Sequence, residues 1–142
     1  MNTLLDKPAR LTPVARCDLH VLLIDDDSFQ LELISGILRG LDVHDITTAS
    51  SGAQALQAMT GQSSRFNLLV MDLHMPGMDG FQFMGELARM GYAGALIIVS
   101  GQSDDVMHAA SMVAQLRRFT LLGSVPKPVG RAALAQLINQ LA

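Results

Sequence analysis

Short runs of apolar and β-branched residues alternate along this chain with longer segments that have helical spacing. The short runs predict strands at residues 20–24, 46–49, 68–71, 95–99 and 121–125. Between and after them, apolar residues recur every three or four positions, which predicts five helices. Because strands alternate with helices, we expect an α/β fold: a doubly wound, five-stranded parallel sheet flanked by five helices.

The boundaries of two helices can be predicted from local residues. Asp27 or Ser28 is expected to cap the first helix, since both side chains accept hydrogen bonds from free amide groups, and Gly40 is expected to follow its end. A third helix should begin after Gly80. Its inward-facing residues are predicted to be Phe81, Met84, Leu87 and Ala88.

Chemically active residues follow four of the five predicted strands. They are Asp25, Asp26 and Asp27 after the first, Asp72 after the third, Ser100 after the fourth and Lys127 after the fifth. The carboxyl ends of parallel strands meet at one edge of the sheet, where open α/β folds place their ligands. The sequence therefore predicts a single site built from residues that are distant along the chain.

The residue types at this edge suggest metal-assisted phosphoryl transfer. Gathered carboxylates repel one another unless a hard cation lies among them, and Mg²⁺ prefers oxygen ligands. Asp26 and Asp72 are the expected direct ligands, Asp25 could orient a coordinated water, and the backbone carbonyl of His74 could be a further ligand.

Two further residues would complete such a site. Lys127 can pair with a carboxylate or a phosphoryl oxygen, and Ser100 brings a hydroxyl donor. Asp72 would be the nucleophile. Each residue taken alone also fits a helix cap, a turn or a surface lysine, and only their shared position favours a site.

Length and composition are compatible with one folded domain. The chain has 142 residues, of which 49% are hydrophobic. Residues 1–18 contain two prolines and no periodicity, which predicts an arm or linker before a domain at 19–142. No apolar run is long enough to span a bilayer, and the N-terminus lacks the apolar region of a signal peptide. With a single cysteine, Cys17, we expect a cytoplasmic protein.

Charge is unevenly distributed. The net charge is −3, yet residues 106–142 contain four basic side chains and no acidic one. Such a face is either simply solvated or docks an acidic partner, an effector domain or a second copy of the chain. Four isolated cations do not form a nucleic-acid footprint, so no direct nucleic-acid binding is expected. Zinc-ligand spacing, a Walker-type phosphate loop and a nucleophile elbow are all missing from the sequence.

With these residues identified, the chain resembles the receiver domain of two-component response regulators over about residues 20–142. The motifs that carry the resemblance are Leu23-Ile24-Asp25-Asp26-Asp27, Met71-Asp72-Leu73-His74-Met75-Pro76-Gly77-Met78-Asp79-Gly80, Ile98-Val99-Ser100-Gly101 and Val125-Pro126-Lys127-Pro128. The second motif is highly specific, and the others fall in the family's order. The resemblance implies the flavodoxin-like receiver fold.

The resemblance also implies residue roles. Asp72 would accept a phosphoryl group from the phosphohistidine of a histidine kinase or phosphotransfer protein, with Mg²⁺ as cofactor. Asp25 and Asp26 match the acidic pair, Ser100 the switch hydroxyl and Lys127 the invariant lysine. The Lys127–Pro128 bond is expected to be cis, as is usual in the family. Such a protein is a phosphoacceptor switch rather than an enzyme, with slow self-dephosphorylation.

Three features depart from the usual receiver pattern. Ser124 occupies the position of the switch aromatic, three residues before the lysine. The segment between Ser100 and Lys127 is longer than usual, which resembles receivers attached to cyclic-di-GMP phosphodiesterase domains. No effector domain follows residue 142, so the chain is either a single-domain regulator or the receiver portion of a larger one. His74 and Gln102 match the variable positions that flank the phosphoryl group, and we expect them to tune its hydrolysis.

Two other functions remain open from the sequence. A haloacid-dehalogenase-like phosphatase would use Asp25 as its nucleophile, but such enzymes need a late acidic pair and no acid follows Asp105. A receiver fold acting as a phosphate-independent scaffold would not need the acid cluster or Lys127. The modified aspartate would separate the phosphatase from the switch.

Overall fold

A computed structural model of the chain describes residues 15–62, 65–75, 77–101, 108–109, 112–113 and 119–141. Five strands form one parallel sheet in the order β2-β1-β3-β4-β5. The strands are β1 (His20–Ile24), β2 (Asp45–Ala49), β3 (Leu68–Asp72), β4 (Ala95–Ser100) and β5 (Thr120–Pro126). The predicted parallel sheet is confirmed, and each strand lies within two residues of its predicted bounds.

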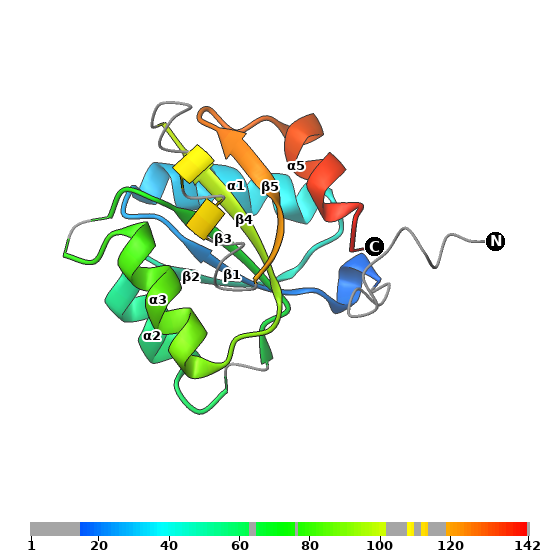
Figure 1. The fold of residues 1–142 in the computed structure, drawn as a ribbon. Helices are drawn as coiled ribbons and strands as arrows, with labels where there is room; N and C mark the ends of the chain where they lie inside the picture. Colours follow the sequence, from blue (N-terminus) through cyan, green and yellow to red (C-terminus); the bar gives the residue numbers. More distant parts are fainter. Residues whose placement is uncertain are drawn as a thin grey trace.

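Four α-helices with complete bounds cover the sheet. They are α1 (Ser28–Gly40), α2 (Gly52–Met59), α3 (Gly80–Met90) and α5 (Arg131–Ile138). Residues 108–109 and 112–113 are also helical, and the rest of the predicted fourth helix lies outside the described residues. In Figure 1, α1 and α5 lie on one face of the sheet and α2 and α3 on the other. None of the helices in the described ranges is long and apolar enough to cross a membrane.

The alternation of side chains along the strands produces two cores. Leu22, Leu69 and Leu96 pack on the face that α2 and α3 cover. Val21, Leu68 and Val70 pack on the opposite face, against residues of α1 and α5. Because successive strand side chains point to opposite faces, a strand buried on both sides must be apolar throughout. All residues of β3 and β4 are buried, and each strand ends on a polar residue.

The first helix begins as predicted but ends differently. The Asp27 side chain caps α1 by accepting a hydrogen bond from the Phe29 amide at 2.9 Å. Gly40 is the last residue of α1 rather than the residue after it, and Asp42 adopts the left-handed conformation, with φ of 68°. An aspartate tolerates that conformation better than most residues, so the glycine is not needed there.

The prediction for α3 was partly wrong. Phe83, Met84 and Leu87 are its fully buried apolar residues, while Phe81 and Ala88 are only partly buried against the same core. A capping box between Asp79 and Gln82 fixes the start of this helix. With the start of α3 fixed by this cap, the helix face that packs against the sheet includes Phe83, Met84 and Leu87.

The segment before β1 is joined to the carboxyl end of α1. Residues Arg16–Asp18 form a 3-10 turn, η2, and Arg16 donates a hydrogen bond to the Leu41 carbonyl oxygen at 3.4 Å and another to Asn139. Arg131 of α5 donates to the carbonyl oxygen of Gly40 at 2.9 Å. Cations suit this end of a helix, where carbonyl groups lack partners. The predicted domain boundary at residues 18 and 19 stays a prediction.

Candidate functional site

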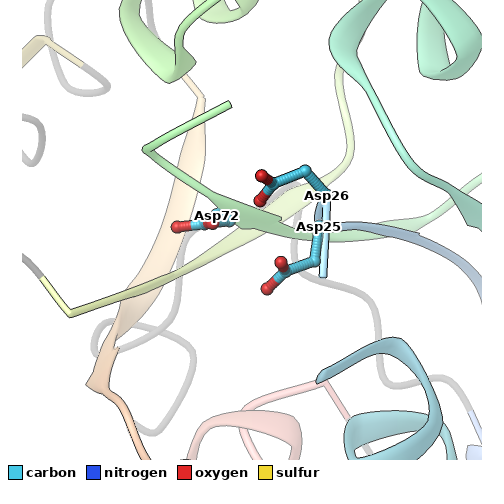
Figure 2. A group of neighbouring side chains, drawn as sticks. All are labelled: Asp25, Asp26 and Asp72. Atoms are coloured by element: carbon cyan, nitrogen blue, oxygen red, sulfur yellow. The ribbon is translucent and has the colours of Figure 1, made fainter. Parts of the chain in front are cut away.

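The neighbouring strands β1 and β3 bring three carboxylates together. Ile24 pairs with Met71, so Asp25 and Asp26 leave β1 beside Asp72 at the end of β3. Figure 2 shows the three side chains grouped at this edge of the sheet. One carboxylate oxygen from each lies within 4.8 Å of the others. Asp25 and Asp72 are buried, whereas Asp26 is exposed.

The backbone next to each buried carboxylate fixes its orientation. Asp25 Oδ1 accepts a hydrogen bond from the Asp27 amide at 2.9 Å, and Asp72 Oδ1 accepts one from the His74 amide at 3.2 Å. Both bonds run two residues forward, as in the turns that aspartate favours. The second oxygen of each carboxylate is therefore left to face the centre of the site.

The loop after Asp72 is held by a close approach of backbone. The Gly80 amide donates to the Leu73 carbonyl oxygen at 2.8 Å. A Cβ on Gly80 would lie 2.9 Å from Leu73 Cα, so only glycine fits this position. The start of α3 thus fixes the backbone immediately after the strand-end aspartate.

Lys127, which follows β5, forms ion pairs with both buried carboxylates. Its Nζ lies 2.9 Å from Asp25 Oδ2 and 3.2 Å from Asp72 Oδ2. Its amide donates to the Ser100 carbonyl oxygen at 3.0 Å, which ties β5 to the end of β4, and Ser100 is buried. The Lys127–Pro128 peptide bond is cis, as expected.

Burial and charge oppose each other in this cluster. Burial is the largest influence on Asp72 and, with the charge of Asp25, raises its pKa, although the His74 amide and Lys127 act in the other direction. Burial alone would lower the pKa of Lys127, but hydrogen bonding and charge from Asp25 and Asp72 outweigh it and raise that pKa. Three acidic groups therefore face one ammonium group, and negative charge is in excess.

The donor set fits a hard divalent cation. Asp25 Oδ2 is buried and lacks a well-directed hydrogen bond, although the Lys127 ammonium is 2.9 Å away. With Asp26 and Asp72 it offers carboxylate oxygens from three residues around one point. Oxygen ligands and room for retained waters are what Mg²⁺ requires.

Most of the residues chosen from the sequence lie at this edge of the sheet. Asp25, Asp26, Asp72 and Lys127 are in one cluster, Ser100 ends the strand between Asp72 and Lys127, and His74 is exposed beside them. Ser124 is exposed on β5. Gln102 lies outside the described residues.

One contact could not be foreseen from the sequence. The Asp25–Lys127 ion pair is the shorter of the two that Lys127 makes, yet strands β3 and β4 separate β1 from β5. The only available signal was that both residues follow buried strands.

The late basic residues do not all form one surface. Lys127 is engaged in the acid cluster, and Arg131 contacts the end of α1. Arg117 and Arg118 lie outside the described residues. Lys127 therefore does not contribute to the basic docking face predicted from the sequence.

Comparison with known families and sequences points to one kind of protein. Residues 21–139 match the response regulator receiver domain. The two-component response regulator ARR12 of Arabidopsis thaliana is 33% identical over 86 residues, which are 61% of this chain and 14% of ARR12. The transcriptional regulatory protein GlrR of Escherichia coli (strain K12) is 31% identical over 120 residues, 84% of this chain and 25% of GlrR. The chain thus spans a quarter or less of the length of these relatives.

Solved structures give the same result for the fold. A response regulator receiver domain protein from Clostridium thermocellum superposes with a TM-score of 0.73 and 27% identity, covering 87% of this chain and 93% of that one. A chain of the CheX-CheY-BeF3-Mg²⁺ complex from Borrelia burgdorferi superposes with a TM-score of 0.74 and 20% identity, covering 84% of this chain and 86% of that one.

Proposed function

Because this chain belongs to the response regulator receiver domain family of two-component systems, we propose that it is a switch whose Asp72 accepts a phosphoryl group from a phosphohistidine. The donor would be a histidine kinase or a phosphotransfer protein. Receiver domains of response regulators are generally signalling switches. We propose the same here: the chain is itself phosphorylated and later dephosphorylated, and it does not act as an enzyme on a separate substrate.

The observation that carries the proposal is the pairing of Asp72 with Lys127 beside a second buried acid, Asp25, that shares the same ammonium group. The ammonium group lies 3.2 Å from Asp72 Oδ2 and 2.9 Å from Asp25 Oδ2. A phosphoryl group brought to Asp72 adds further negative charge to a site that already has an excess. Cations placed where that charge develops are the main catalytic device of phosphoryl transfer.

The transfer requires little from the protein beyond positioning. An oxygen of the ionised Asp72 carboxylate attacks phosphorus, the phosphorus–nitrogen bond of the phosphohistidine breaks, and the imidazole nitrogen keeps the electron pair. Lys127 pairs with a phosphoryl oxygen, and Ser100, which ends the neighbouring strand, supplies a hydroxyl group. A general base is not needed because the nucleophile is already a carboxylate.

We propose Mg²⁺ as the cofactor of this step. Asp25, Asp26 and Asp72 would hold it, together with the backbone carbonyl of His74, and Asp25 could act through a coordinated water. When bound, the ion neutralises charge on the carboxylates and on the phosphoryl oxygens. Its binding also explains how two buried aspartates and an exposed one can share a single edge of the sheet.

We propose that phosphorylation is read by another domain or protein. The two relatives described above are much longer than this chain. Contacts through residues 106–142 to an effector domain, a partner protein or a second copy remain predictions, as do attachment to a cyclic-di-GMP phosphodiesterase and a cytoplasmic location. Switching would bias two pre-existing states. With Ser124 in place of the switch aromatic, the coupled movement of an aromatic ring does not apply.

The test is to locate the modified residue. The full chain is treated with acetyl phosphate and Mg²⁺, the acyl phosphate is trapped by borohydride reduction, and peptides are mapped by mass spectrometry. We expect label on Asp72, loss of label in Asp72→Asn, and unchanged labelling in the matched variant Asp79→Asn, whose cap an asparagine can replace. Label on Asp25 would instead support the phosphatase, and no label at all would support the scaffold.

A further inference from the structure

The turn between β2 and α2 lies at the same edge of the sheet as the acid cluster. It consists of residues 50–51 and leads into Gly52, the first residue of α2. The last residue of β2, Ala49, accepts a hydrogen bond from the Asp25 amide at 3.1 Å. The turn therefore begins beside one of the buried carboxylates.

Side-chain hydrogen bonds hold this turn in one conformation. Ser51 caps α2 by accepting a hydrogen bond from the Gln54 amide at 3.1 Å. The side-chain oxygen of Gln54 accepts in return from the Ser50 amide at 2.8 Å and from the Ser50 hydroxyl group at 2.9 Å. Such bonds satisfy amide groups that the first turn of a helix leaves without partners. The turn thus offers a fixed surface to the residues that pack against it.

Gly52 leaves a space on that surface, and the side chain of Met78 fills it. A Cβ on Gly52 would lie 3.0 Å from Met78 Sδ and 3.3 Å from both Cβ and Cγ of Met78. These distances are shorter than the optimal separation of carbon atoms in contact. An alanine at position 52 would therefore push Met78 away by a few tenths of an ångström.

Neither backbone conformation nor helix propensity explains this glycine. Gly52 is not among the residues with positive φ, so other residues can adopt its conformation. Alanine also has the higher helix propensity. Within the described residues, the close packing of Met78 is therefore the physical reason for a glycine at the start of α2.

Met78 belongs to the β3–α3 loop, whose described residues are 73–75 and 77–79. The two ends of this loop are joined, because the Gly80 amide donates to the Leu73 carbonyl oxygen at 2.8 Å. A displacement of Met78 must therefore be taken up inside the loop.

The same loop orients the proposed phosphoacceptor. The His74 amide donates a hydrogen bond to Asp72 Oδ1 at 3.2 Å. The next residue, Met75, is buried in the core against which Met78 packs. A shift of the packed methionine side chains would therefore change the position of the amide that holds the Asp72 carboxylate.

We propose that Gly52 is a positioning residue for the chemistry of Asp72. The space at Gly52 seats Met78, and this contact holds the β3–α3 loop in the conformation that orients the carboxylate. The inference rests on the proposed phosphoryl transfer to Asp72. Such transfer depends mainly on positioning, and a small misplacement caused by a residue away from the chemistry can slow it markedly.

The proposal is tested by labelling the full chain with acetyl phosphate and Mg²⁺ at a temperature where each variant is folded. We expect Gly52→Ala to be labelled at least about fivefold more slowly than the wild type, or about 1 kcal/mol in the barrier. Gly36→Ala is the matched control, since nothing lies within 4 Å of a Cβ there, and it should keep the wild-type rate. Urea unfolding and circular dichroism report on the fold. A merely structural role of Gly52 would lower the urea midpoint without slowing the labelling of the folded chain.

A double-mutant cycle tests whether Gly52 acts through Met78. Met78→Ala removes Sδ and Cγ, two of the three close atoms, and should itself slow labelling because it empties the space. In that background, the further change Gly52→Ala should alter the rate by less than about twofold, since residues in contact have non-additive effects.

Amide NMR separates this proposal from the proposed function. In the metal-free, unphosphorylated chain, the His74 amide resonance should shift in Gly52→Ala and Met78→Ala but not in Gly36→Ala. A wild type that takes up no label would refute the phosphoacceptor, whereas shifts of the His74 resonance would still support the positioning of the loop. Three results would overturn the positioning role: wild-type labelling of Gly52→Ala, equal slowing by Gly52→Ala with and without the Met78 side chain, or an unmoved His74 resonance.

Discussion

At the scale of single residues, Asp72 combines two opposing requirements. It must be ionised to act as a nucleophile, yet it is 4% exposed and lies near the charge of Asp25. The His74 amide and the Lys127 ammonium offset only part of the burial, so the pKa of Asp72 is raised. The site is therefore electrostatically costly to the fold in the absence of a metal ion.

Removing this charge should stabilise the metal-free fold. A raised folded-state pKa means that the carboxylate is harder to ionise in the folded chain than in the unfolded one, and stability is lost as the pH rises through that pKa. In EDTA at pH 7.5, Asp72→Asn is expected to have a higher Tm than the wild type. As the pH is lowered and Asp72 becomes protonated, the Tm difference should shrink, which circular dichroism can follow. A less stable Asp72→Asn at pH 7.5 would contradict this account.

His74 and Gln102 are the residues expected to control how long the phosphoryl group persists. His74 is exposed next to Asp72, where its side chain can obstruct or orient an attacking water. His74→Ala and Gln102→Ala should each change the lifetime of the phosphorylated chain by about threefold or more, which requires less than 1 kcal/mol in the barrier. The lifetime is measured by removing the phosphodonor and following the fraction of chain that still carries the acyl phosphate over time. His44→Ala, an exposed histidine just before β2, is the control, and unaltered lifetimes in both variants would remove the claim.

At the scale of elements, the turn from β3 into α3 holds the strand-end aspartate in place. Gly80 packs against the backbone of Leu73, and the capping box of Asp79 and Gln82 stabilises the first turn of α3. Backbone atoms cannot move aside as side chains can. The turn therefore requires glycine at position 80, because any larger residue would place a Cβ against the Leu73 backbone.

Two glycine variants separate this requirement from general helix propensity. Gly80→Ala is expected to destabilise the chain by about 2 kcal/mol, because its Cβ would lie 2.9 Å from Leu73 Cα. Gly36→Ala is the matched control, since nothing lies within 4 Å of a Cβ there, and it should stabilise α1 by about 0.5–1 kcal/mol. Urea unfolding measures both. Equal effects of the two substitutions would show that the close approach does not matter.

Sequence patterns predicted the elements better than their orientation. The strand ends at Asp25, Asp72 and Lys127 follow from apolar runs that stop at polar residues, and parallel pairing brings them to one edge. Phe83 was missed because the periodicity around Gly80 fits more than one helical face. The cap and the packing of the whole helix decide between these faces, and neither is visible in a short window of sequence.

At the scale of the whole molecule, strand order decides which distant residues meet. Lys127 reaches Asp25 although two strands lie between β1 and β5, because the side chains project beyond the end of the sheet rather than across it. That contact depends on the twist of the sheet and on the length of the lysine side chain. A list of strands contains neither, which is why the sequence predicted the cluster but not its shortest ion pair.

A divalent cation should stabilise the whole chain through this cluster. An ion that binds the folded state only adds about 1.4 kcal/mol at a tenfold excess over its dissociation constant. We expect Mg²⁺ to raise the Tm of the wild type above its value in EDTA, and this increase to be lost in Asp26→Asn. Glu86→Gln, which removes a remote acid, should retain it. Equal responses in the wild type and Asp26→Asn would place the ion elsewhere.

The hydrogen bonds of Arg16 have a consequence for anything attached to this protein. Arg16 donates hydrogen bonds to Leu41 and Asn139, so the segment before β1 and the segment after α5 lie side by side. Both lie at the end of α1 farthest from Asp27, and hence at the opposite side of the sheet from Asp72. A fluorescent tag joined near either segment would sit roughly one strand length, about 17–20 Å, from the acid cluster. Such fusions would leave the entrance to Asp72 open. Trimming the chain to begin at Leu19 would remove both hydrogen bonds of Arg16.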